Sequence, residues 1–253
     1  MKENKFAGER LESKSNLSKN NLLEHLARYE LVKGDKDSIV LDIGCGAGHG
    51  SFNLADRFKQ IYGVDISGEA INYAKKNWSA NNITFLIGSA TKLPFADNYF
   101  DLAVAFEVFE HIADWKKFLT ELKRVTKDKG LIYLSTPNKD IYSPSTTKPI
   151  NPYHFFEMTE KEFKQALSQY FIIKKFLGQR TPVYNDHWIW QIINPILFAF
   201  RPIISYKLNN TLKLKIINWI KPNLDATDIK FYDDQSNIEK SRFLVAICEN
   251  NKS

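Results

Sequence analysis

The chain has 253 residues, of which 43% are hydrophobic, and carries a formal net charge of +6. A chain of this length suits one large domain, or one domain with a substantial insertion, and its composition can fill a sizeable core. The charge allows mild attraction to acidic partners, but the lysines are spread along the chain and form no basic stripe with interleaved aromatics of the kind that binds nucleic acid. Two cysteines are too few for a disulfide framework or a zinc-ligand spacing.

The N-terminal stretch 1–20 is polar and lacks the apolar core of a secretory signal, so a cytoplasmic location is expected. Apolar residues then recur at helical spacing within 20–29, at Leu22, Leu26 and Tyr29, and an asparagine is available as the cap. Residues 1–35 are therefore predicted to form an N-terminal helical cap.

The stretch 39–48 organises the rest of the chain. Its apolar half, 39–43, is typical of a short buried parallel strand. Gly44, Gly46 and Gly48 follow at alternate positions and lead into a helical pattern. Glycines let the backbone turn sharply and approach a ligand closely, and the following helix points its first N–H groups at that ligand. Alone, such a turn also occurs for purely steric reasons.

Asp65 indicates what kind of ligand the glycine turn binds. It ends the next strand, 61–65, about 20 residues after the first glycine, where a carboxylate meets a ribose diol in Rossmann-like folds. The turn and the acid together predict a nucleoside site. Asp42, just before the glycines, narrows the ligand, because a carboxylate there would repel a pyrophosphate and suits a ligand that carries an ammonium and a sulfonium.

Strands and helices alternate through the first 180 residues, which predicts an α/β fold with a parallel sheet. Ligands of open parallel sheets bind beyond the carboxyl ends of the strands, where this chain has Asp65, Ser89, Ala90, Glu107 and Thr136. Strands are expected at 39–43, 61–65, 83–87, 100–106, 130–136 and 170–177, and helices near 48–58, 67–78, 114–126 and 159–168, with Ser67, Asp114 and Thr159 at the starts of the last three.

The alternation breaks over 178–240, which is predicted to be an insertion between the core, 36–177, and a last strand, 241–249. All of 1–253 would then be a single domain. The aromatic stretch 188–206 is interrupted by polar residues, an arginine and prolines, so it does not resemble a transmembrane span. A lid over the acceptor, a homodimer face and a membrane-surface patch all remain open.

Five motifs make the chain resemble the class I S-adenosylmethionine-dependent methyltransferases. The resemblance covers about 38–138, and a looser one extends to a bacterial branch often associated with sugar and polysaccharide modification. It implies a Rossmann-like fold with a mostly parallel sheet, an antiparallel last strand and an inserted helical lid. The motifs are Val40-Leu41-Asp42-Ile43-Gly44-Cys45-Gly46-Ala47-Gly48, Gly63-Val64-Asp65-Ile66-Ser67, Gly88-Ser89-Ala90-Thr91-Lys92-Leu93-Pro94-Phe95, Glu107-Val108-Phe109-Glu110-His111-Ile112 and Gly130-Leu131-Ile132-Tyr133-Leu134-Ser135-Thr136-Pro137-Asn138.

The resemblance also implies how S-adenosylmethionine, and the product S-adenosylhomocysteine, would be held. Asp65 would accept the ribose hydroxyls, and Arg28 on the N-terminal helix could bind the carboxylate. Ser89 stands where many relatives have an Asp that accepts from the adenine amine. The other expected cofactor contacts are Asp42, Gly44, Cys45, Gly46 and Gly48 at the methionine end, Ile66 and Ala90 near the adenine, and Phe106.

Two carboxylates and two imidazoles are expected at the same edge of the sheet. Glu107, Glu110, His111 and His154 resemble the metal ligands of the small-RNA 3′-terminal 2′-O-methyltransferases, and such a set fits a divalent metal such as Mg²⁺ or Mn²⁺. In the wider superfamily a histidine at the position of His111 lines the site without metal. His111 is then the candidate general base, with Glu107 beside it.

The sequence therefore predicts a methyltransferase that methylates an oxygen of a small metabolite or glycan-type acceptor. One alternative is a metal-dependent RNA 2′-O-methyltransferase, although the charge pattern makes nucleic acid the less favoured partner. Another is a non-catalytic scaffold that keeps the methyltransferase fold.

Overall fold

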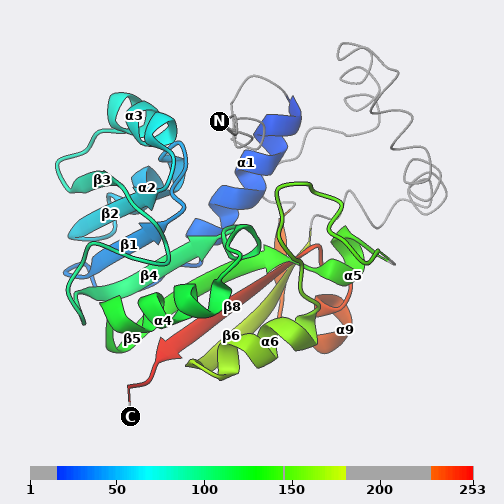
Figure 1. Ribbon diagram of the computed structural model, residues 1–253. Helices are drawn as coiled ribbons and strands as arrows, with labels where there is room; N and C mark the ends of the chain where they lie inside the picture. Colours follow the sequence, from blue (N-terminus) through cyan, green and yellow to red (C-terminus); the bar gives the residue numbers. More distant parts are fainter. Residues whose placement is uncertain (1–15, 145, 181–228, 253) are drawn as a thin grey trace.

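The computed structural model describes residues 16–144, 146–180 and 229–252. Within them, eight strands form one sheet in the order β3-β2-β1-β4-β5-β8-β6-β7 (Figure 1). The strands are β1 (Ile39–Ile43), β2 (Gln60–Asp65), β3 (Ile83–Ile87), β4 (Phe100–Phe106), β5 (Thr126–Pro137), β6 (Phe171–Arg180), β7 (Lys230–Tyr232) and β8 (Phe243–Asn250).

Helices cover both faces of this sheet. They are α1 (Asn16–Tyr29), α2 (His49–Leu54), α3 (Gly68–Asn77), the 3₁₀ turn η2 (Phe109–His111), α4 (Trp115–Val125), α5 (Lys139–Tyr142), α6 (Glu160–Ser168) and α9 (Gln235–Ile238).

The pairing of the strands confirms the predicted architecture. Strands β1 to β5 are parallel to one another, and β8 inserts antiparallel between β5 and β6. The fold is thus Rossmann-like, with a mostly parallel sheet and an antiparallel last strand. The helical lid expected within the insertion concerns residues 181–228, which lie outside the described residues.

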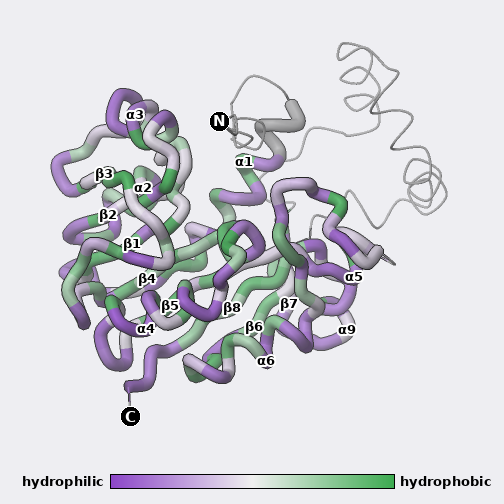
Figure 2. Tube along the Cα trace, viewed as in Figure 1, coloured by the Kyte–Doolittle hydropathy of each residue, from purple (hydrophilic) through white to green (hydrophobic). Residues whose placement is uncertain are grey.

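Alternating side chains of β1 explain the two faces of the core. Leu41 packs with α4 and α6, which lie in front of the sheet in Figure 1, whereas Val40 packs with Tyr29 of α1 and Leu54 of α2 behind it. Figure 2 shows hydrophobic residues concentrated on the central strands and hydrophilic ones on the outer turns and helices. Two covered faces are the reason why the strands read as nearly continuous apolar runs.

Three predicted helix starts are confirmed by their caps. The side chain of Ser67 accepts a hydrogen bond from the Ala70 N–H, and that of Asp114 accepts one from the Lys117 N–H. Thr159 forms a capping box with Glu162 at the start of α6. These motifs are local in sequence, so they can be read without knowledge of the tertiary structure.

Several predicted boundaries are wrong by a few residues. Helix α2 ends at Leu54 rather than near 58, where the Ala55 N–H bonds to the Phe52 carbonyl in a tighter turn. Strand β5 starts at Thr126, before a register shift against β4.

Residues near both ends of the predicted insertion 178–240 are part of the sheet. Residues 178–180 pair with β7, and Gly178 approaches Ser241 so closely that a Cβ would lie 2.2 Å from its hydroxyl. A three-residue strand such as β7 is too short for its pattern to show in the sequence.

The carboxyl ends of β1 to β5 and of β6 meet at one edge of the sheet, together with the start of β8, where Phe243 lies opposite Pro137 and Gln179. Helix α1 lies above this edge in Figure 1. Residues that are more than one hundred positions apart in sequence therefore become neighbours there.

Candidate active site

The glycine turn between β1 and α2 has a backbone that only glycines adopt easily. Gly44, Gly46 and Gly48 have φ values of 67°, 52° and 90°, all in the left-handed region. The turn is fixed by the Gly44 N–H, which donates to the Val64 carbonyl at 2.7 Å, and by the Gly48 N–H, which donates to the Cys45 carbonyl at 2.9 Å. The left-handed backbone at these three alternate positions explains why each of them is a glycine.

The three glycines differ in what surrounds them. A Cβ on Gly44 would lie 2.3 Å from Val108, and one on Gly48 would lie 2.8 Å from Ala74, so both positions are tightly packed. A Cβ on Gly46 would have nothing closer than a backbone oxygen 4.0 Å away. Gly46 therefore faces open space, as expected for the part of a turn that a ligand approaches.

Asp65 lies beside this open space at the end of β2. Its Oδ2 accepts from the Gly46 N–H at 3.0 Å and its Oδ1 from the Ser67 N–H at 2.7 Å. These bonds tie the glycine turn to the start of α3 and fix the orientation of the carboxylate. Each carboxylate oxygen keeps a second lone pair, which could accept a ribose hydroxyl.

Asp42 is fully buried beneath the turn. Its Oδ1 accepts from the Tyr29 hydroxyl at 2.9 Å and its Oδ2 from the Ser51 hydroxyl at 2.5 Å. The pKa of Asp42 is raised from 3.8 to about 7, chiefly by burial and to a smaller extent by the charge of Asp65, while the hydrogen bonds from the two hydroxyls act in the opposite direction. Because both of its oxygens accept hydrogen bonds from side chains, Asp42 is held in place and supports the turn from below.

The expected adenine side of the site is open. Ile66 is 68% exposed at the end of β2, and the Ser89 hydroxyl bonds to the Thr91 hydroxyl at 3.0 Å. Ala90 is half-buried next to it. An exposed isoleucine beside a partly free hydroxyl suits the face and edge of a flat ring.

Two other expected contacts point into the protein. Phe106 is buried, with its ring edge against the Tyr29 ring at 5.0 Å between centroids. Cys45 is also buried, and burial raises the pKa of its thiol. Only the backbone of these residues can border a ligand.

Arg28 of α1 is buried at the same edge. One of its terminal nitrogens donates to the Gln179 Oε1 at 3.0 Å and lies 3.4 Å from the Glu107 Oε1, and its guanidinium stacks over the Phe243 ring. The Arg28 Nε is buried and has no hydrogen-bond partner in the part of the chain that the structure describes. The Nε–H of Arg28 is thus a donor that remains available near the carboxyl ends of the strands.

Glu107 has a backbone that is rare for a side chain of its kind, with φ of 56°. Its N–H donates to the Ser135 hydroxyl at 3.0 Å, and that hydroxyl donates back to the Glu107 Oε1 at 2.7 Å. These bonds and Arg28 hold the strained residue in place. They also point its carboxylate toward α1 and β5.

Glu110, His111 and His154 come together, and Glu107 does not join them. Ligand atoms of these three side chains all lie within 4.8 Å of one another, and the two imidazole rings meet edge to face at 4.8 Å between centroids. The four-residue cluster expected from the sequence is therefore reduced to three in the described part of the chain, because Glu107 is engaged by Arg28 and Ser135.

Each imidazole ring of the cluster has one nitrogen hydrogen-bonded to a neighbouring oxygen. The His111 Nδ1 lies 3.1 Å from the Tyr153 carbonyl, and the His154 Nδ1 lies 2.7 Å from the Glu157 Oε1. Both partners accept, so each Nδ1 carries a proton, and in the neutral form of either ring the Nε2 then carries the lone pair. Burial and then Glu107 raise the pKa of Glu110 well above its usual range, and Thr136 donates to its Oε2.

Sequence reasoning missed several partners of these residues. Tyr29 and Ser51 hold Asp42, Ser135 holds Glu107, and Gln179 holds Arg28. Their spacing along the chain gives no signal, because each contact forms only when strands and helices distant in sequence meet.

The fold and the turn define a class of protein, and comparisons with known proteins agree with it. Residues 41–134 match the family model of a methyltransferase domain. A probable S-adenosylmethionine-dependent methyltransferase of Mycolicibacterium smegmatis is 32% identical over 128 residues, which are 51% of this chain and 49% of that protein. An uncharacterised methyltransferase of Bacillus subtilis, YcgJ, is 29% identical over 163 residues, covering 59% of this chain and 63% of that one. The chain thus spans about half to three fifths of these relatives.

Solved structures show the same fold. The crystal structure of Bacillus subtilis YcgJ has a TM-score of 0.55 at 20% identity and covers 92% of this chain and 99% of that one. The cyclase SpnF has a TM-score of 0.58 at 17% identity, covering 94% of this chain and 83% of that one. Since a cyclase shares it, the fold alone does not determine the reaction.

The domain match and the motifs agree with each other. Residues 41–134 are similar to a methyltransferase domain, and the relatives support the predicted resemblance to the class I S-adenosylmethionine-dependent superfamily. No helix within the described residues has the length and apolar character needed to cross a bilayer.

Proposed function

We propose that the protein is a methyltransferase that binds S-adenosylmethionine and methylates an oxygen of a small metabolite or glycan-type acceptor. The observation that carries this proposal is the open space at Gly46 beside the fixed carboxylate of Asp65. Bound there, the cofactor would supply an electrophilic methyl group on a sulfonium. The protein must then chiefly align the acceptor and exclude water.

A hydroxyl acceptor must also lose its proton. His111 is the proposed base, because its Nδ1 donates to the Tyr153 carbonyl and its Nε2 therefore carries the lone pair that accepts a proton. Glu107 is proposed to act as a positioning residue, since its carboxylate is engaged by Ser135 and faces Arg28.

Calorimetry with S-adenosylhomocysteine tests the cofactor site. The variant Asp65→Ala should bind it more weakly by roughly 1.5–3 kcal/mol, the scale of lost hydrogen bonds to a charged group. Asp56→Ala is the matched control, because Asp56 is an exposed acid outside the site. If neither S-adenosylmethionine nor S-adenosylhomocysteine binds the wild type at high micromolar concentration, the protein is the non-catalytic scaffold instead.

A second candidate is a metal-dependent RNA 2′-O-methyltransferase, which the convergence of Glu110, His111 and His154 favours. These side chains would hold Mg²⁺ or Mn²⁺, which would supply open positions for acceptor oxygens. The fit is partial, since Glu107 lies outside the group and the His154 Nε2 is 3.0 Å from the Asn151 amide nitrogen.

Metal binding and RNA methylation can be measured separately. Mn²⁺ titrated into the wild type should bind with an affinity that His154→Ala abolishes and His49→Ala leaves unchanged. Radiolabelled methyl transfer to RNA should depend on Mn²⁺. Absence of RNA labelling under conditions where S-adenosylmethionine binds removes this candidate.

Three further proposals concern the rest of the chain. The acceptor lid, the homodimer face and the membrane-surface contact through 188–206 all involve residues 181–228, outside the described residues. These interpretations and the cytoplasmic location stay predictions.

A further inference from the structure

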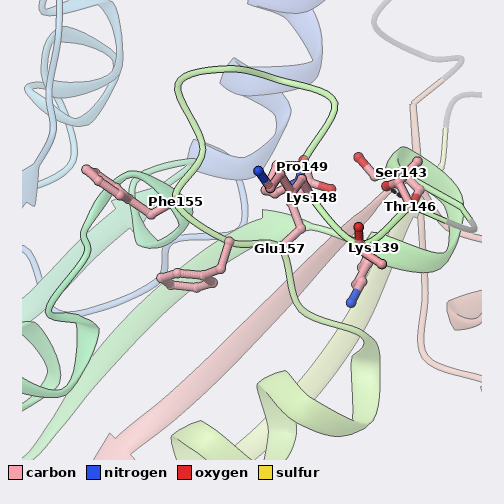
Figure 3. Close-up of a pocket in the computed structure, with 9 residues that line it drawn as sticks. Lys139, Ser143, Thr146, Lys148, Pro149, Phe155 and Glu157 are labelled. Carbon is pink, nitrogen blue, oxygen red and sulfur yellow. Dashed lines mark hydrogen bonds between the residues drawn. The ribbon is translucent and has the colours of Figure 1, made fainter.

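A cavity of about 120 Å³ lies between α5 and the loop that precedes α6 (Figure 3). We propose that it is an acceptor subsite that takes one hydroxyl-rich ring, a sugar unit, and that Glu157 anchors this ring. The inference rests on the proposed function and names its acceptor class. The side chains that carry the argument belong to Lys139, Ser143, Thr146, Lys148, Phe155 and Glu157.

Glu157 is the reason to expect a ligand. Its side chain is only 1% exposed, and its Oε1 accepts from the His154 ring. Its Oε2 is also buried but has no hydrogen-bond partner among the described residues. A buried carboxylate oxygen without a donor is costly. Because Glu157 lines the cavity, a hydroxyl group inside it could supply the missing donor.

The rest of the wall suits a sugar. Lys139 and Lys148 offer donors, and the Thr146 hydroxyl, which donates to the Ser143 carbonyl, can accept. Phe155 offers an aromatic ring that is 62% exposed. In Figure 3, Phe155 lies at one end of the cavity and Lys139 with Ser143 at the other. Hydroxyl groups both donate and accept, so a sugar can satisfy all of these groups at once.

A phosphate fits less well than a sugar. The two lysines would attract it, but the Glu157 carboxylate would repel it at short range. The volume also limits the ligand, since whole small-molecule sites occupy roughly 300–1,000 Å³. The cavity therefore suits a single ring and excludes a nucleotide.

The cavity is joined to the candidate active site through one loop. Glu157 holds His154, whose ring contacts that of His111, and the Phe155 N–H donates to the Glu110 carbonyl at 2.9 Å. A ring bound at Glu157 would therefore be connected through the His154 side chain to His111, the group proposed to receive the acceptor proton. This continuity distinguishes an acceptor subsite from a surface pocket elsewhere on the fold.

Saturation-transfer NMR on the full chain, with the methyl glycosides of glucose, galactose and mannose, tests the proposal. Glu157→Gln should weaken the binding of a responding glycoside about tenfold or more, because a charged acceptor is replaced by a neutral amide. The exposed acid Asp56 provides the control Asp56→Asn. Lys148→Met should weaken binding less, and Lys161→Met on the exposed side of α6 should leave it unchanged.

Each outcome decides the inference. Binding that weakens in Glu157→Gln and Lys148→Met, but in neither control, supports it, provided that both variants retain the wild-type melting temperature. Binding that is unchanged in both variants overturns it. Binding of inorganic phosphate with no glycoside binding overturns it as well. Failure of S-adenosylhomocysteine to bind the wild type would refute the proposed function, while the glycoside result would still decide what the cavity takes.

Discussion

Asp42 shows how one residue in a recognisable motif can serve a purpose other than the expected one. The motif predicts that it contacts the cofactor, yet its two oxygens accept from Tyr29 and Ser51 beneath the glycine turn. A carboxyl group with both oxygens held in this way stiffens the turn from below. Whether it also touches the ligand stays a prediction.

The raised pKa of Asp42 predicts a dependence of stability on pH. Its folded pKa of about 7 exceeds its ordinary value of 3.8, so the folded state holds this proton more tightly than the unfolded state does. The free energy of unfolding should therefore fall as pH rises from about 4 to 7, and then level off. The contribution is on the order of 4 kcal/mol.

Urea unfolding of the wild type and Asp42→Asn at several pH values checks this expectation. Asparagine does not titrate, so the difference in stability between the two proteins should shift in favour of the variant as pH approaches 7. Parallel curves across that range would contradict it.

At the scale of elements, the contact between α1 and α2 supports the glycine turn. The Tyr29 ring packs directly on Gly50, where a Cβ would lie 2.0 Å from the ring. Gly50 therefore permits the approach that brings the Tyr29 hydroxyl to Asp42. Gly46 and Gly48 shape the turn, whereas Gly50 lets α1 and α2 approach each other.

The pair Gly46→Ala and Gly50→Ala separates these two requirements. Gly50→Ala should destabilise the fold by about 1–3 kcal/mol, because Tyr29 must move away. Gly46→Ala meets no neighbouring atom and should cost about 1–2 kcal/mol of backbone strain, but its methyl group would enter the space proposed for the cofactor.

Urea unfolding and calorimetry with S-adenosylhomocysteine measure the two effects. We expect the affinity to fall more than about tenfold in Gly46→Ala at a temperature where the variant is folded. Equal affinity in Gly46→Ala and the wild type would place the cofactor elsewhere.

At the scale of the whole molecule, Arg28 joins the N-terminal helix to the far half of the sheet. Its partner Gln179 lies 151 positions away, and Gln179 in turn donates to the Glu24 carbonyl at 2.7 Å. The order of strands makes this possible, because β6 and β8 end and begin at the edge that α1 covers. The same contacts also position Glu107.

Arg28→Met should lower the free energy of unfolding by about 2–3 kcal/mol, less than for a fully buried ion pair because Glu107 is partly exposed. Urea unfolding measures it, with the exposed Lys36→Met as the control. If Arg28 also binds the cofactor carboxylate, the variant should lose affinity for S-adenosylhomocysteine but keep it for 5′-methylthioadenosine, which lacks that carboxylate. Equal losses for both ligands would assign Arg28 a structural role only.

The sequence by itself determined the features whose causes are local. The strand-helix alternation, the glycine turn, the acid at the end of β2 and the caps at Ser67, Asp114 and Thr159 each depend on neighbours within a few positions. Hydrophobic period and turn chemistry are short-range properties, so these predictions succeed.

Only the tertiary structure decided which side chains meet. It separated Glu107 from Glu110, His111 and His154, gave Asp42 and Arg28 their partners, and left the Glu157 Oε2 unpaired beside a cavity. The physical reason is that hydrogen bonding and burial act between atoms in space. A contact such as that of Arg28 with Gln179 exists only because the order of strands carries distant residues to the same edge of the sheet.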